Sequence, residues 1–325
     1  MTIVRAADLD LTDQDIAQAA DLFGIAETER LGGFENALFR SIAPPGRVLR
    51  LTHTSRRSVE MIHAEFEFMS HVAEQGVPVV APIRSLDGRL VEGVEIASGE
   101  HLVVACMTEA QGRFRRRDEW TDTEIERYGK LLGAMHRAAE SFKPEGPLRP
   151  PWTDPIFDVE LSAAEASDPE LFRRVGEVRA ACAAHRAGGT GLLIHQDAHF
   201  GNLHVTDDGQ ISIFDFDDCA YGTPTHDIAI VLFYWLMGRG EEQHSVARRF
   251  VTHFLRGYER HRTLPADWPE GADRFLSLRE IDIYWLIKEE SPEDVSPLEQ
   301  RFMDGRRNRI LDAVTYLDSP LGDIL

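Results

Sequence analysis

The sequence predicts an α+β fold in two lobes, a small lobe with an antiparallel sheet and then a mainly helical lobe. The first observation is the length, because 325 residues exceed the usual size of a single hydrophobic core. The second is a run of strand-like segments between residues 26 and 53. The third is the C-terminal third, where apolar residues recur at helical spacing in three stretches, over residues 246–258, 275–287 and 298–316.

The small lobe is expected to begin with an amphipathic helix over residues 12–23, with Thr12 as its N-cap. Three antiparallel strands then fill residues 26–53, because glycine and proline pairs break this stretch twice. A second helix is predicted over residues 58–75, where apolar residues recur every three or four positions. Asp87-Gly88 favours a hairpin before a buried strand.

Composition restricts the partners and the location. A formal net charge of −20 argues against nucleic-acid and anionic-membrane binding, which need basic surfaces. Apolar runs stay shorter than a membrane span, and the N-terminal stretch lacks the features of a signal peptide. The three cysteines, Cys106, Cys182 and Cys219, are scattered and form no Cys-x-x-Cys pair. A reducing cytoplasm is therefore the expected location.

Two apolar segments end on polar residues that can perform chemistry. The first leads into a loop that contains His195, Asp197 and Asn202, and the second ends at Asp215. A hairpin turn at Asp208-Gly209 would bring the two segments together, so that Asp197, Asn202 and Asp215 converge. An asparagine and a carboxylate suit Mg²⁺, which prefers oxygen ligands and phosphate. Asp197 would then be free to accept a proton, an arrangement typical of phosphoryl transfer.

These residues resemble the aminoglycoside phosphotransferase and choline kinase family, whose fold is like that of protein kinases. The family's His-x-Asp-x-x-x-x-Asn loop is matched by His195, Asp197 and Asn202, and its metal-binding Asp by Asp215. The resemblance implies an ATP-dependent, Mg²⁺-dependent phosphotransferase that transfers the γ-phosphate to a hydroxyl of a small molecule, such as an aminoglycoside, choline or homoserine-like acceptor. The spacing within residues 77–82 also resembles homoserine-kinase-like members and bacterial stress-response Ser/Thr kinases, so a protein Ser/Thr acceptor stays open.

The same resemblance implies roles for residues outside the loop. Arg50 takes the place of the strand cation that contacts the nucleotide phosphates, and Glu65 that of its helix partner. Gly33 lies in the turn that covers the nucleotide. The backbone of Thr108 and Ala110 would bind the adenine edge, which places the lobe boundary so that the lobes comprise residues 1–107 and 108–325. The residue matching Asp227 braces the catalytic loop by bonding its backbone.

Other interpretations remain open at this stage. His195, Asp197 and His199 alternate, so on an extended strand they could form the zinc site of a metallohydrolase. An inactive nucleotide-binding module would keep the fold but is disfavoured by the retained Asp197, Asn202 and Asp215. Asp217 is a further metal-proximal candidate, and residues 113–117 form a basic cluster that is interpreted as a solvated loop. The oligomeric state and the acceptor are not determined by the sequence. Aromatic and acidic residues that are candidates for the acceptor pocket are Tyr234, Trp235, Tyr284, Trp285, Glu289 and Glu290.

Overall fold

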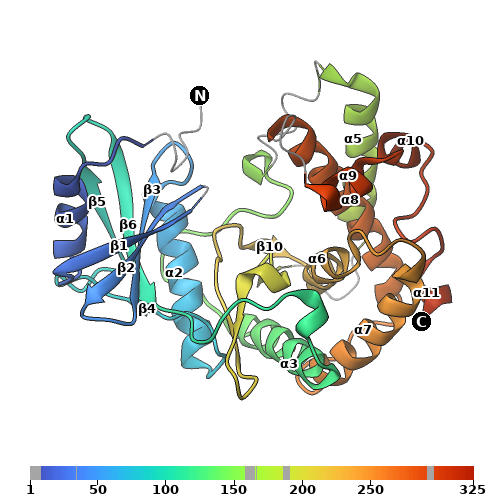
Figure 1. The fold of residues 1–325 in the computed structure, drawn as a ribbon, viewed down its shortest axis with the longest axis horizontal. Coiled ribbons are helices and arrows are strands. Elements are labelled where there is room, and N and C mark those ends of the chain that lie inside the picture. Colours follow the sequence, from blue (N-terminus) through green and yellow to red (C-terminus); the bar gives the residue numbers. More distant parts are fainter. Residues whose placement is uncertain (1–8, 34, 158–164, 166, 186–190, 291–295) are drawn as a thin grey trace.

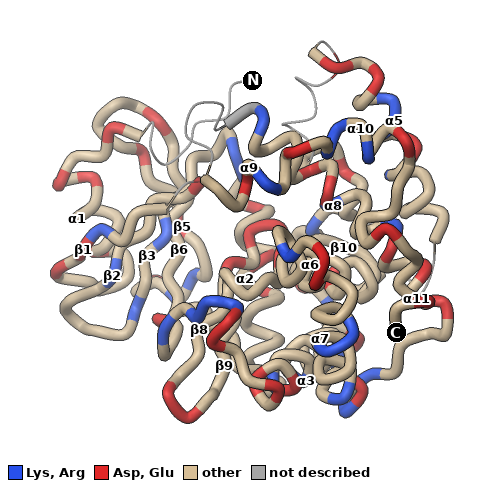
Figure 2. Tube along the Cα trace, turned by 45° about the vertical axis from the view of Figure 1, so that its right-hand side comes forward, with Lys and Arg blue, Asp and Glu red and all other residues tan. Residues whose placement is uncertain are grey.

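The structure is a computed structural model that describes residues 9–33, 35–157, 165, 167–185, 191–290 and 296–325. It has a sheet-containing N-terminal lobe and a larger helical lobe, joined by the chain after β6 (Figure 1). The predicted α+β two-lobed architecture is therefore confirmed. Acidic residues are spread over both lobes (Figure 2). Within the described residues, no helix is long and apolar enough to cross a membrane.

The N-terminal lobe is built on a six-stranded antiparallel sheet in the order β1-β2-β3-β6-β4, with β5 also paired to β6. Its strands are β1 (Glu27–Gly32), β2 (Ala37–Ala43), β3 (Arg47–His53), β4 (Pro82–Ile83), β5 (Val91–Glu95) and β6 (His101–Thr108). Residues 102–107 of β6 are all buried, so both faces of this strand are covered, as is typical of a central strand.

Two helices cover the two faces of this sheet. α1 (Asp13–Asp21) packs against the face that contains Leu102 and Val104. α2 (Val59–Glu74) packs against the opposite face, which contains Val103 and Ala105. Thr12 caps α1 as predicted, in a capping box with Asp15.

The prediction of a hairpin at Asp87-Gly88 was wrong, because the strands before and after this turn do not pair with each other. The chain does turn there, but β4 and β5 pair with successive stretches of the same edge of β6 rather than with each other. The antiparallel hairpin is instead formed by β5 and β6 around Gly99, whose φ of 86° suits glycine.

The second lobe is mainly helical and carries two small β-ribbons, β7 with β10 and β8 with β9. Its helices are α3 (Asp122–Ala139), α5 (Pro169–Ala184), α6 (Pro224–Leu236), α7 (Gln243–Tyr258), α8 (Trp268–Glu290), α9 (Pro297–Met303), α10 (Arg306–Leu311) and α11 (Leu321–Ile324). The ribbon strands are β7 (Leu192–Ile194), β8 (Leu203–Val205), β9 (Ile211–Ile213) and β10 (Ala220–Gly222), and short 3₁₀ turns are η2 (Arg117–Glu119), η3 (Pro155–Phe157), η4 (Phe200–Asn202) and η5 (Gly240–Glu242).

The helix predicted over residues 298–316 is two helices in the structure. Gly305 has a φ of 64°, a left-handed conformation that an α-helix cannot continue through. α9 therefore ends before Gly305 and α10 begins after it.

Helices α3 and α7 approach each other through glycines. A Cβ at Gly129 would lie 1.8 Å from the Phe254 carbonyl oxygen, and one at Gly257 would lie 1.8 Å from the Glu126 carbonyl oxygen. Both contacts involve backbone atoms, which cannot move aside without moving a helix. The close approach of α3 and α7 thus depends on these positions having no side chain.

We expect Gly257→Ala to lower the free energy of unfolding by about 1–3 kcal/mol, because the added methyl must push α3 and α7 apart. Urea unfolding would measure this change. The matched control is Gly176→Ala in α5, where an added Cβ has no atom within 4 Å. Its stability should stay the same or rise by up to about 1 kcal/mol, since alanine favours a helix. Equal effects of the two substitutions would contradict this account of the helix packing.

Candidate active site

The catalytic loop predicted from the sequence follows β7, and the segment with Asp215 follows β9. The hairpin of β8 and β9 forms around Gly209 as predicted. It aligns the two segments, since the Phe214 N–H donates to the Asn202 carbonyl at 3.1 Å. Asp197, Asn202 and the residue before Asp215 are thereby brought to one place between the lobes.

Asp197 is held on both of its carboxylate oxygens. Asn202 Nδ2 donates to Oδ2 at 3.0 Å, and His199 Nε2 lies 3.4 Å from the same oxygen. Arg279 Nη2 donates to Oδ1 at 2.7 Å and also to the Tyr234 hydroxyl at 2.7 Å. Burial disfavours the charge of Asp197, but the His199 ring and the Arg279 guanidinium hold the pKa of this carboxyl at about 2. Asp197 is therefore ionised at neutral pH and can accept a hydrogen bond from a substrate hydroxyl.

The backbone of the catalytic loop is fixed by Asp227 in the first turn of α6. Its two carboxylate oxygens accept the N–H groups of His195 at 2.9 Å and of Gln196 at 2.6 Å. Gln196 has a φ of 65°, which is unfavourable for a residue with a side chain. The bracing expected for Asp227 is thus present in the structure, and its two hydrogen bonds stabilise a loop conformation that would be unfavourable without them.

Asp227 is in turn contacted by His136, which also contacts Tyr258. His136 Nε2 lies 2.9 Å from Asp227 Oδ2, and its Nδ1 lies 2.8 Å from the Tyr258 hydroxyl. All three side chains are buried. His136 is consequently a core histidine, and it joins α3, α6 and α7 to the loop.

His195 links the loop to the segment that carries Asp215. Its Nδ1 accepts the Asp197 N–H at 3.3 Å, so Nε2 carries the proton and donates to the Phe214 carbonyl at 3.1 Å. Burial lowers the pKa of His195, which agrees with a neutral ring. Because both ring nitrogens are used, His195 cannot also ligate zinc. Within the described part of the chain, no three His, Cys, Asp or Glu residues are placed to hold a metal ion together, which disfavours the metallohydrolase interpretation.

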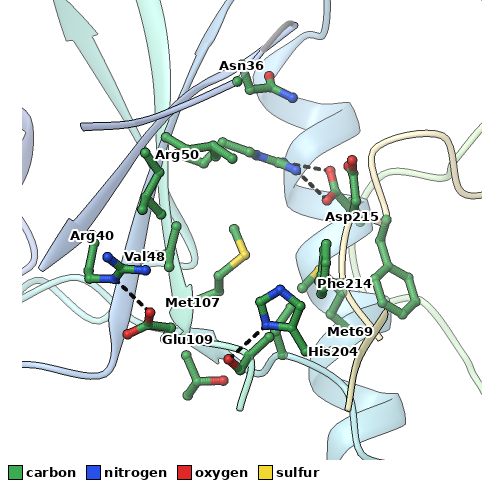
Figure 3. Close-up of a pocket in the computed structure, with 18 of the residues that line it drawn as sticks. Asn36, Arg40, Val48, Arg50, Met69, Met107, Glu109, His204, Phe214 and Asp215 are labelled. Atoms are coloured by element: carbon green, nitrogen blue, oxygen red, sulfur yellow. Dashed lines mark hydrogen bonds and ion pairs between the residues drawn. The ribbon is translucent and has the colours of Figure 1, made fainter. Parts of the chain in front are cut away.

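A cavity of about 410 Å³ lies between the lobes and is lined by six residues that were predicted to form the site (Figure 3). These residues are Gly33, Arg50, Glu65, Thr108, Ala110 and Asp215. Asp197 and Asn202 do not line this cavity but lie beside it in the catalytic loop. The cavity therefore contains the residues that were predicted to contact the nucleotide, while Asp197 lies outside its lining.

Arg50 and Glu65 form the pair that was expected. Both Nη atoms of Arg50 donate to the two Glu65 oxygens, each at 2.7 Å, and both side chains are buried. Arg50 extends across the cavity toward Asp215 (Figure 3). This bidentate geometry fixes the guanidinium plane, so the cation is positioned before any ligand binds.

The cavity also has apolar walls that include Val48, Met69 and Met107, which suit a flat base. The Thr108 hydroxyl accepts the Ala81 N–H at 2.8 Å, while the Ala110 N–H has no hydrogen-bond partner among the described residues. Gly33 has a φ of 111°, and a Cβ there would lie 2.0 Å from the Asn36 carbonyl oxygen. The turn over the cavity therefore requires glycine at this position.

Asp215 is open to the cavity and makes no hydrogen bond or ion pair with another residue of the described chain. The protein around it limits its solvation and, together with the carboxylates of Asp217, Asp197 and Asp218, raises the pKa of Asp215 to about 8. Its φ of 65° aims the side chain away from an ordinary strand direction. An unpartnered carboxylate among other acids fits a divalent cation, which would relieve the repulsion.

Asp217, considered above as a metal-proximal candidate, forms ion pairs with arginines in the structure. It is 2% exposed, its carboxylate pairs with Arg56, and Arg57 Nη2 lies 3.5 Å away. Arg149 holds its backbone carbonyl at 2.6 Å. Asp217 thus anchors the segment after Asp215 to the N-terminal lobe.

Sequence reasoning missed Arg56 and Arg279, which contact the acids of the site from distant positions. Arg279 lies on α8, 82 residues from Asp197, and no local pattern marks it. The basic cluster was only partly a solvated loop. Arg113 and Arg116 are exposed, whereas Arg117 bonds the carbonyls at the end of α6.

The acceptor-pocket candidates whose side chains the structure describes fall into two groups. Tyr234 touches the catalytic loop through a ring contact with His199 at 4.2 Å. Trp235, Tyr284 and Trp285 are buried core residues of the helical lobe. The side chains of Glu289 and Glu290 lie outside the described part of the chain.

A two-lobed fold with a nucleotide-sized cavity beside a braced Asp and Asn loop defines a kinase-like phosphotransferase. Residues 27–265 match the phosphotransferase enzyme family. The chain belongs to this family, and the predicted enzyme class, a phosphotransferase with an alcohol group as acceptor, is confirmed.

The chain is similar to several kinases along most of its length. It is 29% identical to amicoumacin kinase of Bacillus subtilis over 85% of this chain and 84% of that protein. It is 28% identical to homoserine kinase of Bradyrhizobium diazoefficiens over 85% of this chain and 83% of that protein.

Solved structures agree on the fold. A structure of an amicoumacin kinase in complex with AMP-PNP, Ca²⁺ and Ami superposes with a TM-score of 0.85 at 24% identity, covering 97% of this chain and 98% of that chain. A microcompartment-associated aminopropanol kinase superposes with a TM-score of 0.70 at 20% identity, covering 95% of this chain and 100% of that chain.

We expect Asp227→Asn to destabilise the protein and reduce turnover. The amide keeps one acceptor oxygen but turns its NH₂ toward a backbone N–H, and a buried donor without a partner costs about 1–3 kcal/mol. Urea unfolding and initial-rate measurements would show both effects. Asp207→Asn is the control, because Asp207 is exposed in the β8–β9 turn. A variant Asp227→Asn with wild-type stability would show that the loop does not need this brace.

We also expect nucleotide and divalent-cation binding to release a proton. Below a pH of about 8 the free Asp215 carboxyl is largely protonated, and the cation binds the deprotonated form. Affinity should therefore rise as the pH increases from 6.5 to 8.5 and then level off, by up to about tenfold per pH unit for one displaced proton. Calorimetric titrations in buffers of different ionisation enthalpy would count the protons. The rise of affinity with pH should be lost in Asp215→Asn, and its persistence there would assign it to another group.

Proposed function

We propose that this protein transfers the γ-phosphate of ATP to a hydroxyl group of a small molecule, with Mg²⁺ as the divalent cation. The cavity between the lobes supports nucleotide binding, because it combines apolar walls with the charged side chains of Arg50 and Asp215. The names of the similar proteins, kinases of amicoumacin, homoserine and aminopropanol, support a small acceptor rather than a protein Ser/Thr.

The observation that carries the proposal is the arrangement of Asp197, Asn202 and Asp215. Asn202 and Asp215 would hold the cation, since amide and carboxylate oxygens are suitable ligands for Mg²⁺. When bound, the cation would neutralise charge on the phosphate oxygens. Asp197 would accept a hydrogen bond from the acceptor hydroxyl, orient it toward the γ-phosphate and take its proton during transfer.

The remaining predicted residues have consistent positions. Arg50, fixed by Glu65, would contact the nucleotide phosphates, and Gly33 would let the turn lie close over them. The backbone at Thr108 and Ala110 would read the adenine edge, which supports a lobe boundary at residues 107 and 108. The low pKa of Asp197, about 2, makes it a weak base. Its main contribution is therefore orientation, which suits a loose phosphoryl-transfer transition state.

The acceptor is proposed as a class only. Arg279, Tyr234 and His199 surround Asp197, and none of them lines the cavity, so an acceptor at Asp197 would meet both a cation and aromatic surfaces. The protein's location is proposed to be the cytoplasm. Its three cysteines are buried and unpaired, as expected in a reducing compartment.

The proposal is tested by thermal stabilisation and by ADP production. ATP should raise the melting temperature in a Mg²⁺-dependent manner, since a ligand that binds only the folded state stabilises it. A panel of homoserine, 1-amino-2-propanol, an aminoglycoside, choline and amicoumacin should then reveal an acceptor by a coupled ADP assay. Absence of a shift with ATP, in a correctly folded sample, would overturn the proposal.

Two variants separate the roles of the carboxylates. Asp197→Ala should keep the ATP-dependent shift but lose turnover by about 10²–10⁴-fold, because it removes the group that orients the hydroxyl. Asp215→Ala should lose the Mg²⁺-dependent part of the shift. Asp207→Ala, an exposed acid of the nearby turn, should change neither property. Wild-type turnover by Asp197→Ala would contradict its role.

A further inference from the structure

Arg56 lies at the junction between the two lobes, in the connection from β3 to α2. Its side chain is 5% exposed. Nη1 donates to the carboxylate of Asp217, which follows β9 in the second lobe, and Nη2 donates to the carboxylate of Glu35, in the turn over the cavity. Arg56 therefore joins the turn above the nucleotide cavity to the segment that carries Asp215.

The partners of Arg56 differ from those of the neighbouring arginines. Arg50 directs both Nη atoms to Glu65, and both of these side chains are fixed by burial. Arg57 donates to Asp218 at 2.8 Å and to the Arg56 carbonyl at 3.2 Å. Glu35 is different, because it lines the cavity itself. One of the two carboxylates on Arg56 thus belongs to the wall of the proposed nucleotide site.

The carboxylates of Asp217 and Glu35 differ in their exposure to solvent. The Asp217 side chain is 3% exposed, whereas that of Glu35 is 42% exposed. Glu35 can turn into solvent without opening a gap in the core, while Asp217 cannot. Limited solvation disfavours the charged form of Glu35, while Arg56 favours it. The carboxylates of Asp218 and Asp217 disfavour it further, so that the pKa of Glu35 is raised to about 7. The Glu35 carboxylate is therefore the partner that Arg56 can exchange.

Charge balance gives a reason for the exchange. Glu35, Asp215, Asp217 and Asp218 gather at this end of the cleft, where a nucleotide would bring its phosphates. A phosphate oxygen and a carboxylate oxygen are equivalent partners for a guanidinium. If Glu35 moves aside, the Arg56 Nη2 group that bonds it becomes free beside the wall that Glu35 lines, and the carboxylate charge next to the phosphates falls by one.

We propose that Arg56 binds the terminal phosphates of the nucleotide, and that Glu35 occupies this place on the guanidinium until the nucleotide displaces it. Arg56 is then a second phosphate-binding cation beside Arg50, supplied by the connection between β3 and α2. Because Arg56 keeps its bond to Asp217, phosphate binding would also hold the turn over the cavity at a fixed position relative to the Asp215 segment. This inference rests on the proposed nucleotide-binding function.

The test compares ATP, ADP and adenosine, each with Mg²⁺, by calorimetric titration of three variants. Arg56→Gln should weaken ATP binding by about tenfold or more, as expected for loss of a charge-assisted bond, and should leave adenosine binding unchanged. Glu35→Gln should tighten ATP binding several-fold with no effect on adenosine. Arg84→Gln is the control, an exposed arginine of the N-terminal lobe that does not line the cavity, and it should change none of the three affinities.

Each outcome discriminates between the explanations. Equal weakening of ATP and adenosine by Arg56→Gln would mean that Arg56 only supports the fold, and would overturn the inference. Weaker ATP binding in Glu35→Gln would do the same, because it would make Glu35 a required partner of Arg56. If Arg56→Gln does not fold, Glu35→Gln decides alone, since it leaves the bond to Asp217 intact. Failure of the wild-type protein to bind ATP would instead remove the proposed function, and this inference with it.

Discussion

The two hydrogen bonds that Asp227 accepts from the catalytic loop are the interaction on which the site depends. A loop with Gln196 at a φ of 65° is not the conformation that its sequence prefers in isolation. The buried carboxylate makes it the stable one by accepting two consecutive backbone N–H groups. Burial alone would favour the neutral acid, but the bonds from His136 and the loop outweigh it and lower the pKa of Asp227. Asp197 is therefore placed by a charge buried in the helical core.

The end of the cleft that is proposed to bind the nucleotide phosphates shows the opposite electrostatic arrangement. Asp227 has every oxygen occupied, whereas Asp215 has no partner in the described chain and a pKa raised to about 8. The contrast separates a carboxylate that shapes the protein from one that awaits a ligand. Arginines from the N-terminal lobe meet the neighbouring acids, so the two lobes are joined by ion pairs around the same place where a cation and phosphates are proposed to bind.

The sequence predicted most of the fold and the contents of the catalytic loop, because both follow from local patterns. Apolar spacing indicated the helices, and the turn at Asp208-Gly209 was sufficient to align the Asp197 and Asp215 segments. The break at Gly305 was missed, since glycine within a helical pattern does not by itself indicate a left-handed conformation. The pairing of β4 was missed because a two-residue strand has no detectable alternation.

The contacts of the arginines could not be predicted in the same way. Arg279 reaches Asp197 from a helix distant in sequence, and Arg56 is one of two adjacent arginines with no periodic signal. Their partners are decided by how the helices of one lobe pack and how the two lobes meet. A resemblance based on motifs also transfers only matched positions, so it contains no information about side chains that enter the site from elsewhere.

Helix α6 connects two parts of the site that would otherwise be independent. Asp227 in its first turn holds the catalytic loop, while Tyr234 near its end bonds the Arg279 that contacts Asp197. The two positions are seven residues apart, about 10 Å along a helix axis, and nearly all of the helix between them is buried. Inserting one residue would rotate the end of α6 by about 100° and carry Tyr234 away from the loop. Related proteins that use different acceptors should therefore keep α6 at a constant length, with insertions confined to the connections around it.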